Sequence, residues 1–144
     1  MPQLPTQFGL LEYEDGTGID FPQGMPGFEH NREFVLIEQA DIRPIVFLQS
    51  AVAEGPCFIA LPVEAIDPAY EPELSPDERE LLSPNGDAIL LWLAILTAAE
   101  NGPPTANLLA PVAVNLERRV GVQAVRSDQR YSYRHPLGEA GPCS

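Results

Sequence analysis

The residues with the clearest chemical potential are carboxylates gathered between positions 66 and 80. The segment IDPAYEPELSPDE at 66–78 contains Glu71 and Glu73, and a spacing of two on an extended chain places both side chains on one face. Paired carboxylates could act as general acid and base, as they do in a glycosidase. Only Tyr70 offers an aromatic surface nearby, so a charged surface without catalysis is the simpler interpretation. We therefore expect a protein that is not an enzyme.

The soft metal ligands are few and scattered. They are His30, His135, Cys57 and Cys143, and no two of them have the spacing of a structural zinc site. The chain also lacks a phosphate-binding loop, a nucleophile elbow and a dinucleotide fingerprint. We expect neither a metal nor a cofactor.

The segment RYSYRHPL at 130–137 places hydroxyl, guanidinium and imidazole groups side by side. Ser132 and His135 lie three apart, so on an extended chain they point to opposite faces and cannot form a nucleophile–base pair without a turn. The segment predicts a final strand whose tyrosines pack and whose Arg134 pairs with a carboxylate. The alternative is an exposed recognition patch.

The charge balance excludes several partner classes. The formal net charge is −13, and residues 1–100 hold 18 acidic and 3 basic side chains. Such a chain repels phosphate backbones and anionic lipids, so we expect no direct nucleic-acid or membrane binding. The acidity either keeps a monomer in solution or attracts a basic partner protein, and both interpretations remain open.

The N-terminus and the apolar runs indicate where the protein is found. MPQLPTQFGL does not resemble a secretory signal, and the longest apolar run, at 88–99, has 12 residues, fewer than the roughly 18 that span a membrane. We expect a cytoplasmic protein in which Cys57 is a small buried hydrophobe.

One helix and many short strands are predicted. In SPDERELL at 75–82, Ser75 is the expected N-cap, Pro76 the first helical residue and Glu78 the partner that completes a capping box. Apolar runs between turn signals predict the strands, with Trp92 as a core anchor. An antiparallel sheet of this kind avoids open edges by closing, so we expect a mostly all-β, small antiparallel barrel-like fold with one short helix. The expected strands cover 7–13, 19–21 (the return of the first), 34–37, 45–50, 57–61, 88–97, and a hairpin of 107–115 with 119–125.

Several separated stretches together resemble one known family. They are FPQGMPGFE at 21–29, FLQS at 47–50, the acidic segment at 66–78, TANLLAPVAVN at 105–115 and YSYRHPL at 131–137. In order and spacing this chain resembles the FliW family of bacterial flagellar assembly factors. The resemblance implies a single barrel domain over 1–137, followed by a flexible tail at 138–144 to which it assigns no role.

The resemblance also implies two protein partners, flagellin and the RNA-binding translational regulator CsrA. It implies a switch in which free flagellin holds the assembly factor, and export of flagellin releases it to capture CsrA and relieve repression of flagellin translation. A regulator that binds RNA carries a basic surface, which an acidic barrel can attract. We therefore expect a CsrA-facing surface built from Glu71, Glu73, Asp77, Glu78 and Glu80.

The apolar loop FPQGMPGFE allows two interpretations. In one, tight turns fold Phe21, Met25 and Phe28 inward as a plug over one end of the barrel. In the other, Met25 and Phe28 are partly exposed and give flagellin a rigid apolar contact.

The rival function is a small acidic β-barrel that binds or hydrolyses a small molecule or carbohydrate. It requires a deep pocket lined by carboxylates with perturbed ionisation, whereas a filled interior favours protein binding. A third possibility is a generic interaction domain unrelated to flagella.

Overall fold

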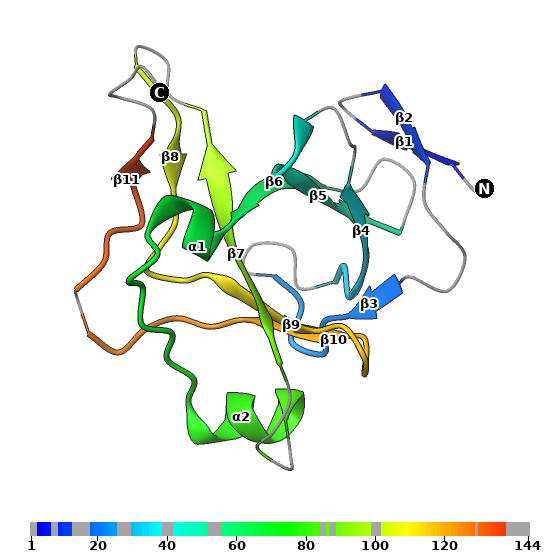
Figure 1. Cartoon of the computed structure of the whole chain (residues 1–144). Helices are drawn as coiled ribbons and strands as arrows, with labels where there is room; N and C mark the ends of the chain where they lie inside the picture. Colours follow the sequence, from blue (N-terminus) through cyan, green and yellow to red (C-terminus); the bar gives the residue numbers. More distant parts are fainter. Residues whose placement is uncertain are drawn as a thin grey trace.

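The computed structural model describes residues 3–6, 9–12, 18–25, 30–38, 42–51, 56–83, 86, 89–98, 102–128 and 130–137. Within them the chain is mostly β, with two short helices (Figure 1). In chain order the elements are β1 Gln3–Thr6, β2 Gly9–Glu12, β3 Gly18–Asp20, β4 Glu33–Glu38, β5 Val46–Ser50, β6 Cys57–Pro62, α1 Val63–Ile66, α2 Pro76–Leu82, β7 Leu91–Thr97, β8 Thr105–Ala106, β9 Val112–Asn115, β10 Val120–Gln123 and β11 His135–Pro136.

The main sheet closes on itself. Its strand order is β11-β8-β7-β6-β5-β4-β3-β10-β9, and an additional pairing of β7 with β9 joins the two ends of the β7-to-β9 series into a barrel. All but one of the ring's pairings are antiparallel; β3 and β10 pair in parallel through Val120 and Asp20. Closure gives each ring strand two neighbours, which removes exposed edges from the ring. The predicted mostly-β, barrel-like fold is confirmed.

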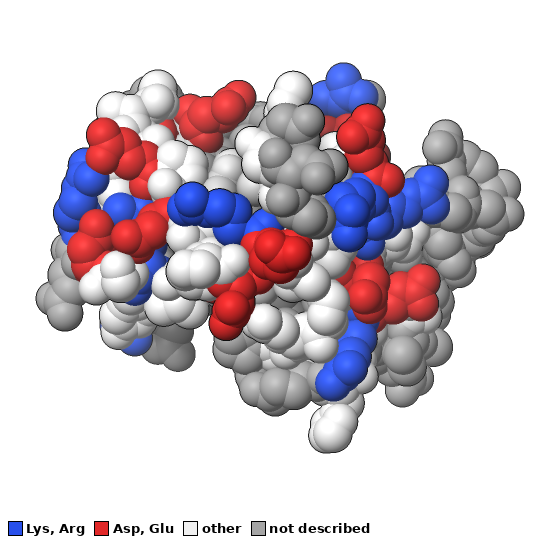
Figure 2. All heavy atoms as spheres, turned by 90° about the horizontal axis from the view of Figure 1, so that it is seen from below, with Lys and Arg blue, Asp and Glu red and all other residues white. Residues whose placement is uncertain are grey.

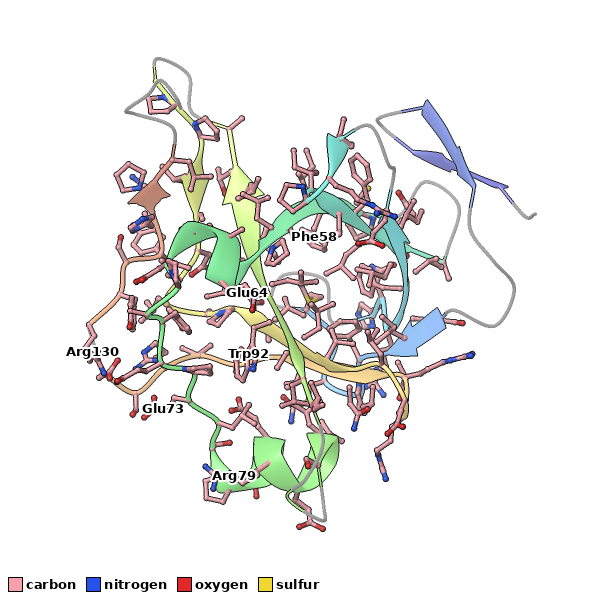
Figure 3. The ribbon with its side chains drawn as sticks, viewed as in Figure 1. Phe58, Glu64, Glu73, Arg79, Trp92 and Arg130 are labelled. Atoms are coloured by element: carbon pink, nitrogen blue, oxygen red, sulfur yellow. The ribbon has the colours of Figure 1, made fainter. Side chains whose placement is uncertain are left out.

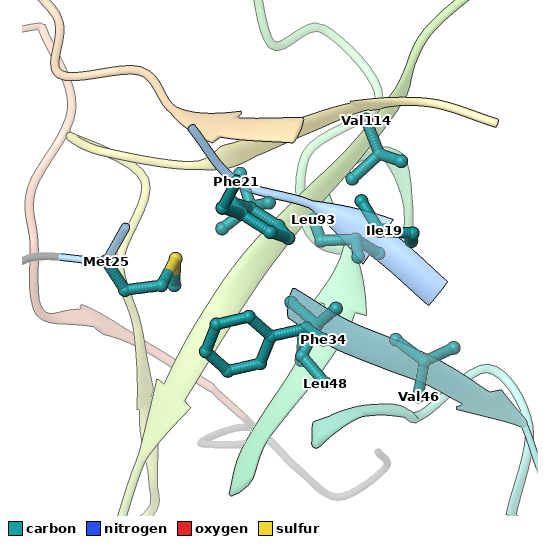
Figure 4. Close-up of a cluster of buried hydrophobic side chains, with 10 residues drawn as sticks. Ile19, Phe21, Met25, Phe34, Val46, Leu48, Leu93 and Val114 are labelled. Atoms are coloured by element: carbon teal, nitrogen blue, oxygen red, sulfur yellow. The ribbon is translucent and has the colours of Figure 1, made fainter. Parts of the chain in front are cut away.

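Alternation along the strands fills the barrel. In β4 the side chains of Phe34 and Leu36 pack into the interior cluster, whereas Val35 and Ile37 pack into a second cluster with Phe47. This strand is therefore buried on both faces. Figure 4 shows the interior cluster, whose buried members are Ile19, Phe21, Met25, Phe34, Val46, Leu48, Ala60, Leu93, Val112 and Val114.

A close contact inside the barrel requires a glycine. The rings of Phe21 and Phe34 meet edge to face with their centroids 5.3 Å apart. Phe21 also lies against Gly121 of β10, where an added Cβ would stand 2.8 Å from the ring atom Cζ. A side chain at position 121 would displace the phenylalanine, so the parallel seam of the barrel depends on a residue without one.

Strand β7 belongs to two layers. It pairs with β6 and β9 in the ring and with β8 in a small sheet that β11 extends. As predicted, the apolar run around Trp92 is a strand. Trp92 itself is partly buried. It packs against two hydrophobic core clusters, those of Val63 and Leu82, and so contributes to the core outside the barrel interior.

The predicted pairings of the first strands also differ from the structure. Strand β2 pairs with β1, which was not expected, and β3 pairs with β4 instead of returning along β2. Proline at position 5 disfavours a strand, which hides β1 from a propensity argument. The helix α1 was likewise not predicted. The predicted hairpin forms as β9 and β10, and both arms are shorter than expected.

Candidate interaction surface

Tyr70 fixes the segment that connects α1 to α2. Its side chain is buried, and its hydroxyl donates a hydrogen bond of 2.7 Å to the carbonyl of Leu108. Burial raises the pKa of this hydroxyl, so it stays protonated and remains a donor. The candidate carboxylates that follow Tyr70 are thereby attached to the barrel at a defined point.

Arg126 is the central group of this region. It follows β10 and is only 7% exposed. Its Nε and Nη2 atoms donate to both oxygens of Asp128, at 2.8 and 2.9 Å, and Nη1 donates to the backbone carbonyl of Glu71. A bidentate, charge-assisted pair of this kind fixes orientation as well as adding energy. The guanidinium lowers the pKa of Asp128, which keeps that carboxylate ionised.

Two tyrosine rings complete the surroundings of the guanidinium. The Arg126 carbon Cζ lies 5.3 Å from the ring centroid of Tyr70 and 4.8 Å from that of Tyr131, and the two rings are 4.3 Å apart. Both distances are within the range of cation–π attraction. We call Arg126, Asp128, Tyr70 and Tyr131 the arginine lock, because they join segments that are remote in sequence.

The two carboxylates nearest the lock are both engaged. Glu71 forms an ion pair with Arg130, which lowers the pKa of the glutamate. Both side chains are exposed, so water and salt screen the pair. Glu73 accepts hydrogen bonds from the backbone N–H of Ser127 at 2.9 Å and from its hydroxyl at 3.2 Å. Figure 3 shows Glu73 on the segment that runs into α2, and Arg130 at the left edge of the view.

Helix α2 begins at the predicted cap. The hydroxyl of Ser75 accepts the Glu78 N–H at 3.2 Å, and the Glu78 carboxylate accepts the Ser75 N–H at 2.8 Å. The predicted capping box is confirmed. It engages the carboxylate of Glu78, one of the five candidate residues, in a hydrogen bond within the helix cap. The helix docks through Leu82, whose side chain is fully buried. The carbonyl of Leu82 also accepts a hydrogen bond of 2.7 Å from Asn115 Nδ2.

Asp77 and Glu80 are exposed, and neither forms an ion pair with a residue that the structure describes. They are thus the most available charges among the five candidates. Figure 2 shows acidic and basic side chains interspersed on the face seen from below. The structure brings the five carboxylates onto one connected region, but that region carries charges of both signs and is not uniformly acidic.

A groove lies between this connecting segment and the end of β10. Its volume is about 290 Å³, and its lining residues are Glu73, Leu74, Ser75, Pro76, Val125 and Ser127. Val125 is 60% exposed although its side chain is apolar. Sequence reasoning singled out neither Val125 nor Arg126; the only local signal is the close spacing of Arg126 and Asp128, which does not reveal their distant partners.

Comparison with known proteins identifies the family. The family described as FliW protein matches residues 4–137. The chain belongs to the FliW family. A flagellar assembly factor FliW from Syntrophomonas wolfei is 34% identical over 95% of this chain and 88% of its own length. The FliW of Bacillus subtilis is 34% identical over 90% of this chain and 92% of its own length.

A solved structure agrees with the assignment. A crystal structure of the flagellar assembly factor FliW superposes with a TM-score of 0.83 at 31% identity, covering 94% of this chain and 96% of that chain. Family membership and the barrel architecture are therefore established together. The tail at 138–144 lies outside the described residues, and the single-domain division stays a prediction.

Three segments that carried the FliW resemblance meet at the arginine lock, and the acidic segment at 66–78 supplies Tyr70. TANLLAPVAVN supplies the Leu108 carbonyl that Tyr70 binds, and YSYRHPL begins with Tyr131. The predicted final strand is short, because only His135 and Pro136 pair with β8. Tyr131 packs as expected, but Tyr133 is 56% exposed and Arg134 lies over its ring at 5.1 Å instead of pairing with a described carboxylate.

The described part of the FliW segment at 21–29 folds into the barrel interior. Phe21 is 1% and Met25 2% exposed, and both belong to the interior cluster. A partly exposed Met25 is therefore wrong, because the barrel core already covers its side chain. Phe28 lies outside the described residues, so its place in the plug or in a flagellin contact stays a prediction.

The described residues contain no group of three or more His, Cys, Asp or Glu side chains placed to hold a metal ion. Among the same residues, no helix has the length and apolar character that crossing a membrane requires.

Proposed function

We propose that this chain is a non-enzymatic flagellar assembly factor that binds flagellin and, in mutually exclusive complexes, the translational regulator CsrA. Its family membership over residues 4–137 carries this proposal, because curated relatives of similar length are named flagellar assembly factors. In the proposed switch, flagellin occupies the factor until export frees it to capture CsrA.

The filled barrel supports a binding role over the carbohydrate-handling alternative. Phenylalanine, leucine and valine side chains occupy the interior where a small-molecule barrel would need a cavity. Among the described residues, the carboxylates with shifted ionisation are Glu71 and Asp128, and both have lowered pKa values. A general acid at neutral pH needs the opposite shift, so their environment favours ion pairing over proton transfer.

If flagellin and CsrA cannot bind at the same time, ordinary affinities for each partner are enough to switch the factor between them. When one partner is present at 100 times its dissociation constant, only about 1% of the factor stays free for the other. A modest fall in free flagellin would then release a large relative amount of factor to bind CsrA. No catalytic step is required.

The test is to pass purified flagellin and CsrA, separately and together, over the immobilised protein. We expect each to be retained alone and flagellin to reduce retention of CsrA. Failure to retain either protein would overturn the proposed function. Retention of both with no mutual effect would overturn the switch and leave the binding role.

The contribution of the acidic residues can be measured separately. The double variant Asp77→Lys with Glu80→Lys reverses the two most available carboxylates, and Glu38→Lys with Glu64→Lys makes the same charge change on other exposed positions. At low salt, we expect the Asp77/Glu80 pair to slow CsrA association more than the control pair does. It should also make the association rate less dependent on salt concentration. Equal slowing by both pairs would show that only total charge matters.

A further inference from the structure

The groove beside α2 has the composition of a site for one apolar side chain. Leu74, Pro76 and Val125 contribute apolar surface, while Glu73 and Ser127 contribute polar atoms at the same opening. Val125 keeps 60% of its surface exposed, so it offers apolar area that a partner could cover. The volume of about 290 Å³ lies just below the usual range for small-molecule pockets and can admit an aliphatic side chain of a bound segment.

The two walls of the groove are held in place before anything binds. Glu73 on one wall accepts from the backbone N–H and the hydroxyl of Ser127 on the other. Beside this contact, Arg126, which precedes Ser127, donates to the carbonyl of Glu71, two residues before Glu73. The groove therefore needs little ordering on binding, which reduces the entropy cost that weakens contacts with flexible loops.

The charges around the groove select the neighbour of that side chain. Glu73 lines the opening with neutral hydrogen-bond partners only, so its negative charge is not neutralised there. Asp77 in the first turn of α2 is exposed and forms no ion pair with a described residue. A positively charged residue next to the bound aliphatic side chain would meet the Glu73 carboxylate. Asp77 follows Pro76, a lining residue of the groove, and adds negative charge at the start of α2.

We propose that this groove is a preformed docking site for an extended protein segment in which an aliphatic side chain is adjacent to arginine or lysine. Val125 and Leu74 contact the aliphatic group, and Glu73 attracts the neighbouring cation. The inference rests on the proposed function in that the partner is a protein, and it adds the place and the chemistry of contact.

The direct test uses two blocked dipeptides that differ only in charge, N-acetyl-Leu-Arg-amide and N-acetyl-Leu-Glu-amide. Each is titrated to millimolar concentration against the ¹⁵N-labelled full chain. We expect the first to shift the amide signals of residues 73–75 and 125–127, with a preference of roughly tenfold over the second. Absence of these shifts, or equal shifts from both dipeptides, would overturn the proposal.

A matched pair of variants locates the effect. Val125→Arg fills the groove and repels the cationic neighbour, whereas Leu116→Arg makes a comparable change at an exposed leucine in the β9–β10 turn, 52% exposed against 60% for Val125. We expect only Val125→Arg to abolish the dipeptide shifts, and equal loss in both variants would contradict the site. Glu73→Gln, which keeps the groove's shape, should remove the preference for arginine.

The two hypotheses fail in different ways. If the wild-type protein retains flagellin or CsrA but its groove ignores the Leu-Arg probe, the docking site is wrong and the proposed function stands. If the probe binds in the groove while neither protein is retained, the docking chemistry stands and the proposed function falls. Weaker capture of one protein by Val125→Arg, with normal capture by Leu116→Arg, would assign that partner to the groove.

Discussion

Replacing Arg126 with methionine tests whether the arginine lock stabilises the fold. Methionine keeps most of the length and packing of the side chain and removes the guanidinium. The variant loses the bonds to Asp128, the bond to the Glu71 carbonyl and the contacts with two tyrosine rings. We expect a decrease in the free energy of unfolding, without loss of the barrel.

The size of that decrease follows from the exposure of each partner. A charge-assisted bond to a backbone carbonyl contributes about 1.5–3 kcal/mol, and stacking on the rings about 0.5–1 kcal/mol. The ion pair is discounted to below about 1 kcal/mol, because Asp128 is 37% exposed and can be rehydrated. Relief of the buried guanidinium's desolvation offsets part of the loss, which leaves about 2–4 kcal/mol.

Urea unfolding followed by circular dichroism measures this change. With a denaturant slope of about 2 kcal/mol/M, the midpoint should fall by about 1–2 M. Arg134→Met is the matched control: the same substitution at an exposed arginine stacked only on Tyr133 should change stability by less than about 0.5 kcal/mol. Equal midpoints for wild type and Arg126→Met would refute the reasoning. Arg126→Lys should recover little, because an ammonium cannot form the bidentate fork.

Three further outcomes are expected. Gly121→Ala should cost about 1–3 kcal/mol by overpacking against Phe21, and a fluorescence-monitored melt that matches wild type would contradict the contact. Ser75→Ala should cost about 1 kcal/mol by removing the cap that Glu78 completes, seen as a lower urea midpoint; an unchanged midpoint would mean that tertiary packing alone holds α2. Burial raises the pKa of Cys57 to about 11 from 9.0. In a variant that lacks the other cysteine, alkylation of Cys57 at pH 8 should therefore be roughly 100-fold slower than alkylation of an unstructured thiol. The alkylation rate should increase with pH up to about 11.

Local features were the ones that could be predicted from the residues. The cap at Ser75 depends on atoms three residues apart, and the apolar runs around Phe34 and Leu93 are long enough to show their burial. The parallel pairing of β3 with β10 could not be predicted, because Asp20 and Val120 are remote in sequence and nothing local specifies their pairing.

The candidate surface was predicted only in part, for the same physical reason. Asp77 and Glu80 are available because they lie on the outer face of a helix that the sequence already predicted. The engagement of Glu71 and Glu73 depends on Arg130 and Ser127, more than fifty positions away. Whether a carboxylate is free to bind a partner protein depends on such distant residues. Composition alone therefore predicted a more acidic face than the structure has.

The parallel seam of the barrel has a consequence for synthesis of the chain. Strand β3 leaves the ribosome early, but the neighbour that covers it, β10, is made 100 residues later, as the register of Asp20 with Val120 requires. Until then Phe21 has no Gly121 to pack against. The cylinder can be completed only when nearly all of the polypeptide has emerged, so β3 lacks its parallel neighbour for most of the chain's translation.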